Sequence, residues 1–243
     1  MIDVFMLPGT GWPHGGDGVT EDFLARLDTR RFRPVIVPYP AEFGQRMSYR
    51  ESVEMGKTAL REAVRATPNL AVIGGYSQGA VIAGDLAAEI GDGLHPELEL
   101  AGVALIADGA RPVGGRIRTA PTEGYGILGE RHINDEDFPV WWAAAIGDPI
   151  TALPVGNPLR TLPPIVEWMS VRTPNDVLLW GSKVLDAVVT RRFQPWWNPA
   201  NWRTWNGALA YARGYLFDGR HGAAYINEGL NQALADAVNS IEE

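Results

Sequence analysis

The chain has 243 residues, of which 46% are hydrophobic and 21% are charged, as is typical of a folded globular protein. Its 29 acidic and 21 basic residues give a net charge of −8, which disfavours binding to nucleic acid. Cysteine is absent, which excludes disulfides and thiolate metal sites, and the four histidines are scattered without metal-binding spacing. We therefore expect neither a metal nor another cofactor.

The sequence carries no segment typical of a membrane span or an export signal. No uninterrupted run of 18 apolar residues occurs, so we expect no integral membrane segment. Residues 1–7 are apolar except for Asp3, but they lack the basic region and the length of a signal peptide. If the protein acts outside a cell, we expect another factor to release it.

Short apolar runs alternate with amphipathic stretches over the first two thirds of the chain, a pattern typical of parallel β-α-β units. Between the second and third runs, Ser48 and Glu51 have the spacing of a capping box and predict a helix start. The runs predict five strands, near residues 2–7, 33–37, 70–74, 101–107 and 139–146. We expect an α/β fold with a doubly wound, mostly parallel sheet and helices on both faces.

The character of the sequence changes after Pro149, where prolines cluster and no further strand is predicted. Helices are predicted to begin at Thr173 and Asn198, and a last helix carries an apolar stripe from Ile226 to Ile241. We therefore expect two parts. Residues 1–149 and 216–243 would form the core, and residues 150–215 a helical insertion that could serve as a linker or lid.

A candidate nucleophile lies at Ser77. An apolar run from Leu70 leads into the pattern Gly-x-Ser-x-Gly, and a helix-forming stretch follows. This context is typical of a nucleophile elbow, where serine lies on a tight strand-to-helix turn and glycines let neighbouring backbone approach. A helix starting at Gln78 would point its free N–H groups toward the serine, where negative charge would develop.

His221 is the predicted base. A serine hydroxyl is a poor nucleophile unless a neighbouring group takes its proton, and histidine is the usual choice. In α/β-hydrolases the chain order is serine, acid, histidine, and only His221 lies beyond the acids that follow the later strands. Without Ser77 upstream, this histidine would be interpreted as a solvent-exposed loop residue.

Two aspartates that follow predicted strands are candidates for the acid that orients the histidine. Asp148 follows the strand at 139–146, two strands after the nucleophile, where hydrolases commonly place their acid. Asp108 follows the strand at 101–107 and remains the alternative. We favour Asp148 as the acid.

Stabilising an oxyanion requires two hydrogen-bond donors. One is predicted to be the backbone N–H of Gln78, directly after the nucleophile. The other is predicted at Thr10, in the loop after the first strand, through its N–H, its hydroxyl or both. Trp12 in the same loop is a candidate substrate contact.

Together these motifs resemble those of the mycobacteriophage lysin B enzymes, which are cutinase-like serine esterases of the α/β-hydrolase fold. The similarity spans essentially the whole chain and is carried by Pro8–Gly11, Gly75–Ala80, Gly126–Leu128, Gly147–Asp148 and His221. The absence of cysteine and the long separation of Asp148 from His221 differ from ordinary cutinases. The segment 107–112 departs from the Gly-Asn-Pro-like ending expected of the family, which keeps Asp108 open.

The resemblance implies an esterase that releases mycolic acids from arabinogalactan during phage-induced host lysis, through Ser77, His221, Asp148 and an acyl-enzyme. Such a protein would be made in the host cytoplasm and would act at the mycobacterial envelope after release. We expect a monomer whose partner is this or another long-chain ester. The alternatives are a general lipid esterase or cutinase, and an inactive hydrolase fold that binds the envelope.

Eight of the nine tryptophans fall between Trp141 and Trp205. Tryptophan suits a lipid-facing boundary, so four of them are predicted to line the acyl-chain side of the site: Trp196, Trp197, Trp202 and Trp205. Their spacing fits a helix packed on the core equally well. Two groups of arginines are expected on solvated faces: Arg30, Arg31 and Arg33, and Arg111, Arg116 and Arg118.

Overall fold

The computed structural model describes residues 1–117, 124–161 and 218–242. Within them, five strands form one sheet in the order β2-β1-β3-β4-β5, and every neighbouring pair is parallel. The strands are β1 (Ile2–Leu7), β2 (Phe32–Ile36), β3 (Ala71–Tyr76), β4 (Leu100–Ile106) and β5 (Val140–Ala143). The predicted strands are therefore confirmed, although the last ends at Ala143 rather than at residue 146.

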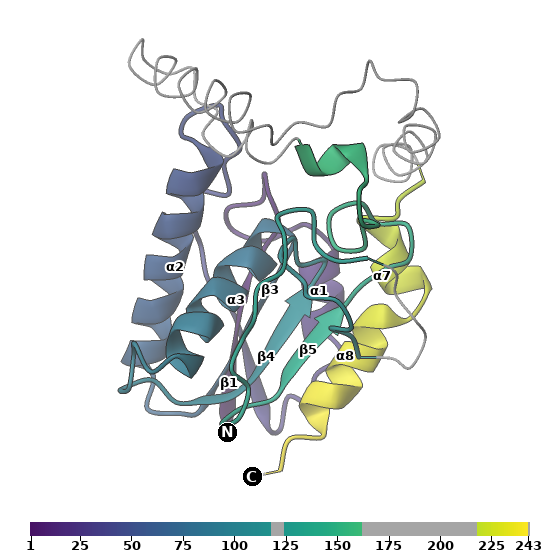
Figure 1. Cartoon of the computed structure of the whole chain (residues 1–243). Helices are drawn as coiled ribbons and strands as arrows, with labels where there is room; N and C mark the ends of the chain where they lie inside the picture. The colour runs from purple at the N-terminus through teal and green to yellow at the C-terminus, as the bar shows by residue number, and fades with distance from the viewer. Residues whose placement is uncertain (118–123, 162–217, 243) are drawn as a thin grey trace, which may run out of the picture.

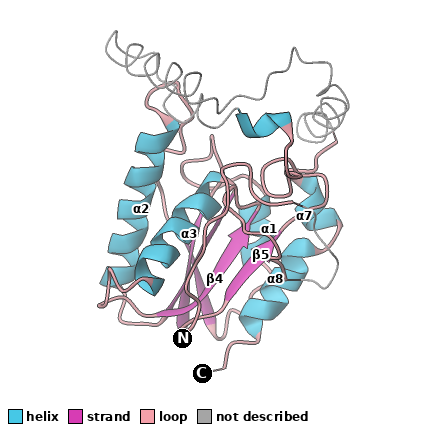
Figure 2. Cartoon of the chain, in the orientation of Figure 1, coloured by secondary structure: helices cyan, strands magenta, loops and turns pink. Residues whose placement is uncertain are grey.

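Helices cover both faces of the sheet, as predicted (Figures 1 and 2). On one face lie α2 (Tyr49–Ala66) and α3 (Gln78–Gly91), whose apolar side chains join those of the strands in one core cluster. On the other face lie α1 (Val19–Leu24), α7 (Ala223–Asn227) and α8 (Leu230–Asn239), which close a second cluster. A short 3₁₀ helix, η1, spans Pro158–Thr161.

The helix predicted after Ser48 is α2, and it begins as expected. The Ser48 hydroxyl accepts a hydrogen bond from the Glu51 N–H at 3.2 Å, and the Glu51 carboxylate accepts one from the Ser48 N–H at 2.8 Å. The apolar stripe of α2 is buried at Val53, Leu60 and Val64. The sequence therefore fixes both the start of this helix and the face that it presents to the sheet.

The prediction of a single helix at the C-terminal end is wrong. Gly229 has a φ of 69°, a left-handed conformation that interrupts the helical path and separates α7 from α8. Leu234 and Val238 of α8 are fully buried, whereas Ile241 lies beyond the helix and packs against the core only in part. The break lets the short α7 turn toward the end of β5 while α8 lies along the sheet.

The strand order brings β1 and β3 side by side at the centre of the sheet, where the direction of winding reverses. Leu7 at the end of β1 pairs with Gly75 near the end of β3. In open parallel sheets of this order, the loops that leave the two central strands diverge and create a crevice at their carboxyl ends. The loop that begins at Pro8 and the turn at Ser77 both start at this end of the sheet.

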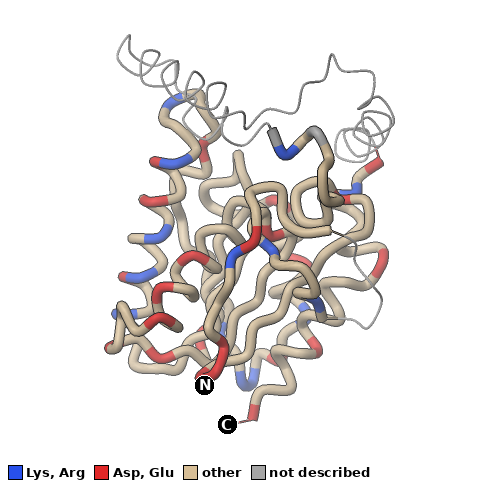
Figure 3. Tube along the Cα trace, in the orientation of Figure 1, with Lys and Arg blue, Asp and Glu red and all other residues tan. Residues whose placement is uncertain are grey.

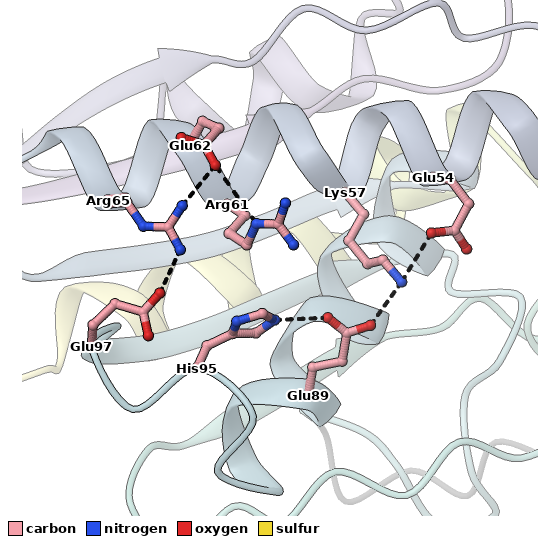
Figure 4. A network of polar contacts seen from close by, with 8 residues as sticks. All are labelled: Glu54, Lys57, Arg61, Glu62, Arg65, Glu89, His95 and Glu97. Carbon is pink, nitrogen blue, oxygen red and sulfur yellow. Dashed lines mark hydrogen bonds and ion pairs between the residues drawn. The ribbon is translucent and has the colours of Figure 1, made fainter.

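Charged residues of both signs lie along the outer side of α2 (Figure 3). Lys57 bridges to Glu89 of α3 at 2.7 Å, and His95 contacts the other oxygen of Glu89 at 3.0 Å. Figure 4 shows the whole network, which ties α2 to α3 and to the loop after α3: Glu54, Lys57, Arg61, Glu62, Arg65, Glu89, His95 and Glu97. Because these side chains are half-buried or exposed, each pair adds at most about 1 kcal/mol to the free energy of unfolding.

One of the arginines expected on a solvated face lies in the interior instead. Arg30, Arg33 and Arg116 are exposed, but Arg111 is completely buried. Two tryptophans of β5 are structural, since Trp141 and Trp142 pack against the two core clusters. None of the described helices combines the length and apolar character needed to cross a membrane.

Several predictions fall outside the described residues. These are the helices expected from Thr173 and Asn198, most of the insertion at 150–215, and Arg118. The four tryptophans predicted to contact the acyl chain, Trp196, Trp197, Trp202 and Trp205, fall there too.

Candidate active site

Ser77 occupies the tight turn between β3 and α3. Its φ of 56° and ψ of −115° are unusual for a residue with a side chain, as a nucleophile elbow requires. The flanking glycines are needed for space. A Cβ atom at Gly75 would lie 2.2 Å from the carbonyl carbon of Gly79, and one at Gly79 would lie 2.1 Å from the carbonyl oxygen of Leu7. The turn therefore packs directly on the end of β1.

The imidazole of His221 reaches this serine from the loop that precedes α7. Its Nε2 lies 2.8 Å from the Ser77 Oγ, a normal hydrogen-bond distance. The Tyr76 hydroxyl donates a hydrogen bond to the backbone carbonyl of His221, and the Tyr76 ring stacks on the imidazole with ring centroids 5.4 Å apart. The residue before the serine therefore holds the histidine in place.

Asp148 lies on the other side of the imidazole. Its carboxylate oxygens are 3.0 and 3.1 Å from His221 Nδ1, and the residue is completely buried. The Ile150 N–H also donates to this carboxylate at 2.9 Å, within the turn that follows β5. Three residues that are distant in the sequence thus form a continuous chain of contacts: hydroxyl, imidazole and carboxylate.

Asp108, the alternative acid, makes different contacts. Its carboxylate accepts hydrogen bonds from Arg131 at 2.7 Å, from the Trp142 indole at 3.1 Å and from the Ala110 N–H at 2.9 Å. Arg131 also bonds the Asp85 carboxylate at 2.9 Å. Asp108 therefore belongs to a buried ion-pair network between β4, α3 and β5, and Asp148 is the aspartate that contacts His221.

The loop after β1 contacts the residue that follows the serine. The Thr10 hydroxyl donates to the Gln78 side-chain carbonyl at 3.2 Å, and the Tyr39 hydroxyl donates to the Pro8 carbonyl at 2.8 Å. Burial raises the pKa of Tyr39 well above its usual value, so its hydroxyl stays protonated and remains a donor. The structure thus brings both predicted oxyanion residues to one edge of Ser77. Trp12, farther along this loop, is about half exposed.

A carboxylate missed by the sequence reasoning fixes the same loop. Asp17 accepts hydrogen bonds from the Gly9 N–H at 2.9 Å and from the Thr20 N–H at 2.7 Å. It therefore joins the loop to the first turn of α1. The only signal in the sequence was an aspartate between glycines shortly before Thr20, which ordinary helix capping also explains.

Arg111 and Tyr225 were also missed, and both support the turn that holds Asp148. The Arg111 guanidinium donates to the carbonyls of Thr151 at 2.7 Å, Gly115 at 2.9 Å and Gly124 at 2.9 Å. Burial lowers the pKa of Arg111 from its ordinary value, while the nearby carboxylates of Asp108 and Asp148 favour its charged form. The Tyr225 hydroxyl donates to Asp148 at 2.5 Å.

No protein-family model matches the sequence. A carboxylesterase Culp6 homolog of Corynebacterium glutamicum is 38% identical over 108 residues, which are 40% of this chain and 35% of that protein. The chain thus spans about a third of the length of this curated relative.

No cluster of potential metal ligands occurs among the described residues.

The fold is similar to that of lysin B from Mycobacteriophage D29, with a TM-score of 0.50 and 23% identity over 76% of this chain and 88% of that one. A cutinase-like protein from Cryptococcus sp. aligns with a TM-score of 0.47 and 16% identity, over 76% of this chain and 88% of its own. The sheet order, the turn at Ser77 and the first of these likenesses define an α/β-hydrolase fold.

Proposed function

We propose that the protein is a serine carboxylesterase, with Ser77 as nucleophile, His221 as base and Asp148 as the acid that orients the histidine. The observation that carries this proposal is the 2.8 Å contact between Ser77 Oγ and His221 Nε2, backed by the buried Asp148. A hydroxyl on a strained turn beside an oriented imidazole is the arrangement that activates serine for acyl transfer. The similarity to a protein named as a carboxylesterase supports the choice of an ester substrate.

The reaction follows from these contacts. Ser77 Oγ attacks the ester carbonyl carbon while His221 Nε2 takes the hydroxyl proton. The C–O bond to the alcohol then breaks, and the imidazolium returns the proton to the departing oxygen, which leaves an acyl-enzyme. Water, deprotonated by His221, attacks the acyl carbon. The bond from this carbon to Ser77 Oγ then breaks, the imidazolium returns the proton to Oγ, and the carboxylic acid leaves. Asp148 accepts the Nδ1–H bond throughout and stabilises the transient imidazolium.

The negative charge that develops on the carbonyl oxygen needs donors already in place. As the first residue of α3, Gln78 has an N–H without an acceptor inside the helix. The Thr10 hydroxyl is held by the Gln78 side chain, and among the described residues no acceptor is recorded for the Thr10 N–H. We therefore assign the two backbone N–H groups of Gln78 and Thr10 to the oxyanion.

Replacing Asp17 by alanine should loosen the loop that follows β1 and carries Thr10, here called the oxyanion loop. The Gly9 N–H and the Thr20 N–H in the first turn of α1 would both lose their acceptor, at a cost of about 1 kcal/mol in stability. Because the loop carries Thr10, we expect kcat/KM for a soluble ester to fall about 10- to 100-fold, mainly through kcat.

The matched control is Asp22→Ala. Asp22 lies in α1, and its carboxylate pairs with Arg26 at 2.7 Å, away from the loop after β1. It should lower stability to a similar extent and leave kcat/KM nearly unchanged. An equal loss of activity in both variants would contradict the role of Asp17.

We further propose a specific substrate, the ester between mycolic acid and arabinogalactan in the mycobacterial envelope. The protein would reach this envelope after release from a phage-infected cell. The resemblance of its motifs to the lysin B enzymes supports this proposal. Trp12, which is exposed beside the oxyanion loop, would then contact the lipid. A general carboxylesterase acting on simpler lipid esters is the second candidate, favoured by the name of the Corynebacterium relative.

Labelling with a fluorophosphonate tests the esterase proposal. The folded protein should incorporate one label per chain at Ser77, identified by peptide mass spectrometry, and Ser77→Ala and His221→Ala should incorporate none. Absence of label from the folded wild-type protein would instead favour an inactive, envelope-binding hydrolase fold. The two candidate substrates are separated by comparing release of fatty acid from purified mycolyl-arabinogalactan with release from triglycerides.

A further inference from the structure

Tyr225 contacts the Asp148 carboxylate through Oδ2, the oxygen that also lies 3.0 Å from His221 Nδ1. It belongs to α7 and is completely buried. Its hydroxyl donates to Asp148 Oδ2 at 2.5 Å and accepts a hydrogen bond from the Ala145 N–H at 3.3 Å. No step of the reaction described above uses this side chain, yet it contacts the acid directly.

The position of Tyr225 links it to both partners of the acid–base pair. It follows His221 by four residues, His221 lying in the loop just before α7 and Tyr225 within α7. Its ring lies edge-on to Tyr76 with centroids 6.3 Å apart, and Tyr76 in turn stacks on the imidazole. Burial, followed by the neighbouring Asp148 charge, raises the pKa of Tyr225 well above 10, so the phenol keeps its proton.

We propose that Tyr225 is a positioning residue that fixes the Asp148 carboxylate and limits how strongly it attracts the His221 imidazolium. The proposal rests on the proposed esterase function. A donor at 2.5 Å from a carboxylate makes a short, charge-assisted hydrogen bond. Such a bond spreads the negative charge of the carboxylate and leaves less of it for the imidazolium that shares the same oxygen.

Other charged and titratable groups also surround the pair. Arg111 contributes a buried positive charge near Asp148, and Arg220 is bound to the Ile146 carbonyl at 2.7 Å and to Glu228. Tyr76 faces the imidazole itself. Asp108 lies in the network with Arg131. Among the described residues, the hydrogen bonds recorded to the Asp148 carboxylate come from His221, the Ile150 N–H and the Tyr225 hydroxyl.

The test is the pH profile of kcat/KM for Tyr225→Phe, measured with a soluble p-nitrophenyl ester. Without the hydroxyl, the carboxylate holds the imidazolium more tightly, so a higher pH is needed to obtain the neutral base. We expect the acid limb, where kcat/KM rises as the base loses its proton, to move up by about one pH unit. The plateau value of kcat/KM should fall about tenfold, the usual range for losing a hydrogen bond to a charged group. A side chain that only fills space would leave the limb in place, because phenylalanine keeps the ring.

A second replacement works in the opposite direction and exchanges one ring hydrogen for fluorine. Introducing 3-fluorotyrosine at position 225 makes the phenol a stronger donor, so the acid limb should move to lower pH. This measurement decides the question if Tyr225→Phe does not fold. Asn231→Ala serves as the control for lost buried hydrogen bonds. Asn231 belongs to α8, and its side-chain amide donates to the Val19 carbonyl at 2.9 Å. It should lower the melting temperature without moving the limb.

The outcomes separate this proposal from the esterase proposal. An active, fluorophosphonate-labelled wild-type protein whose acid limb is unchanged in both Tyr225 variants would overturn the role of Tyr225 alone. A folded wild-type protein without label or esterase activity would overturn both. Opposite shifts of the limb in the two variants would establish the role of the hydroxyl.

Discussion

Asp148→Asn is expected to lower kcat/KM by about four orders of magnitude, as removal of the acid charge does when the geometry of a triad is kept. The carboxylate accepts the His221 Nδ1–H at 3.0 Å and so keeps the Nε2 lone pair directed at Ser77. An amide can turn its NH₂ group toward Nδ1, which favours the tautomer with the proton on Nε2. That tautomer cannot take the serine proton. Kinetics with a soluble ester and the rate of fluorophosphonate labelling both measure the effect.

Asp108→Asn is the matched control for Asp148→Asn. Both aspartates are completely buried and follow neighbouring strands, but Asp108 contacts Arg131 rather than His221. Removing its charge leaves Arg131 without one partner of a buried ion pair, which should cost about 3 kcal/mol of stability. Labelling at a temperature where the variant is folded should remain within about tenfold of wild type. If Asp108→Asn instead abolished labelling while Asp148→Asn preserved it, Asp108 would be the acid.

Arg111→Met should destabilise the fold by about 3–5 kcal/mol, the range for removing a buried charged group that holds several partners. The guanidinium serves backbone carbonyls in three separate segments, represented by Thr151, Gly115 and Gly124. Methionine fills similar space but leaves these oxygens buried without donors, and each unsatisfied group costs about 1–3 kcal/mol. Urea denaturation of the purified protein measures the loss.

The exposed Arg116 offers the comparison for this variant, because Arg116→Met changes the same charge in the same loop. Its free energy of unfolding should stay within about 0.5 kcal/mol of wild type. Arg111→Lys should fall between the two, since a single ammonium cannot reach all three segments. A loss below about 1 kcal/mol for Arg111→Met would show that the buried carbonyls find other donors.

Much of the fold could be predicted because its signals are local. The strands are continuous apolar runs, and α2 is marked by a capping box at Ser48 and by an apolar stripe. The elbow at Ser77 needs glycines at fixed spacing, which the sequence displays directly. Chain order then limited the histidine to His221. Strand order favoured Asp148 over Asp108, and Asp148 is the aspartate that contacts the imidazole.

The features that escaped prediction depend on contacts between distant segments. Arginine is usually exposed, so nothing near Arg111 revealed that three turns would converge on its guanidinium. Tyr225 looks like any apolar helix position until β5 brings Asp148 against it. Gly229 sits within a convincing helical pattern, and only its left-handed backbone shows the break. The last strand ends early because Ala144 and Ala145 leave the ladder for the turn toward Asp148.

The crowding around the elbow restricts how this chain could be altered by laboratory evolution. Positions 75 and 79 have no room for even a methyl group, and a Cβ atom at Gly9 would lie 2.8 Å from the Tyr76 ring. The spacing between the serine turn and the oxyanion loop is therefore set by main-chain contact rather than by replaceable side chains. A mutant library that aims to change substrate preference should leave these glycines untouched and vary exposed positions at the rim, such as Trp12 and Ile146.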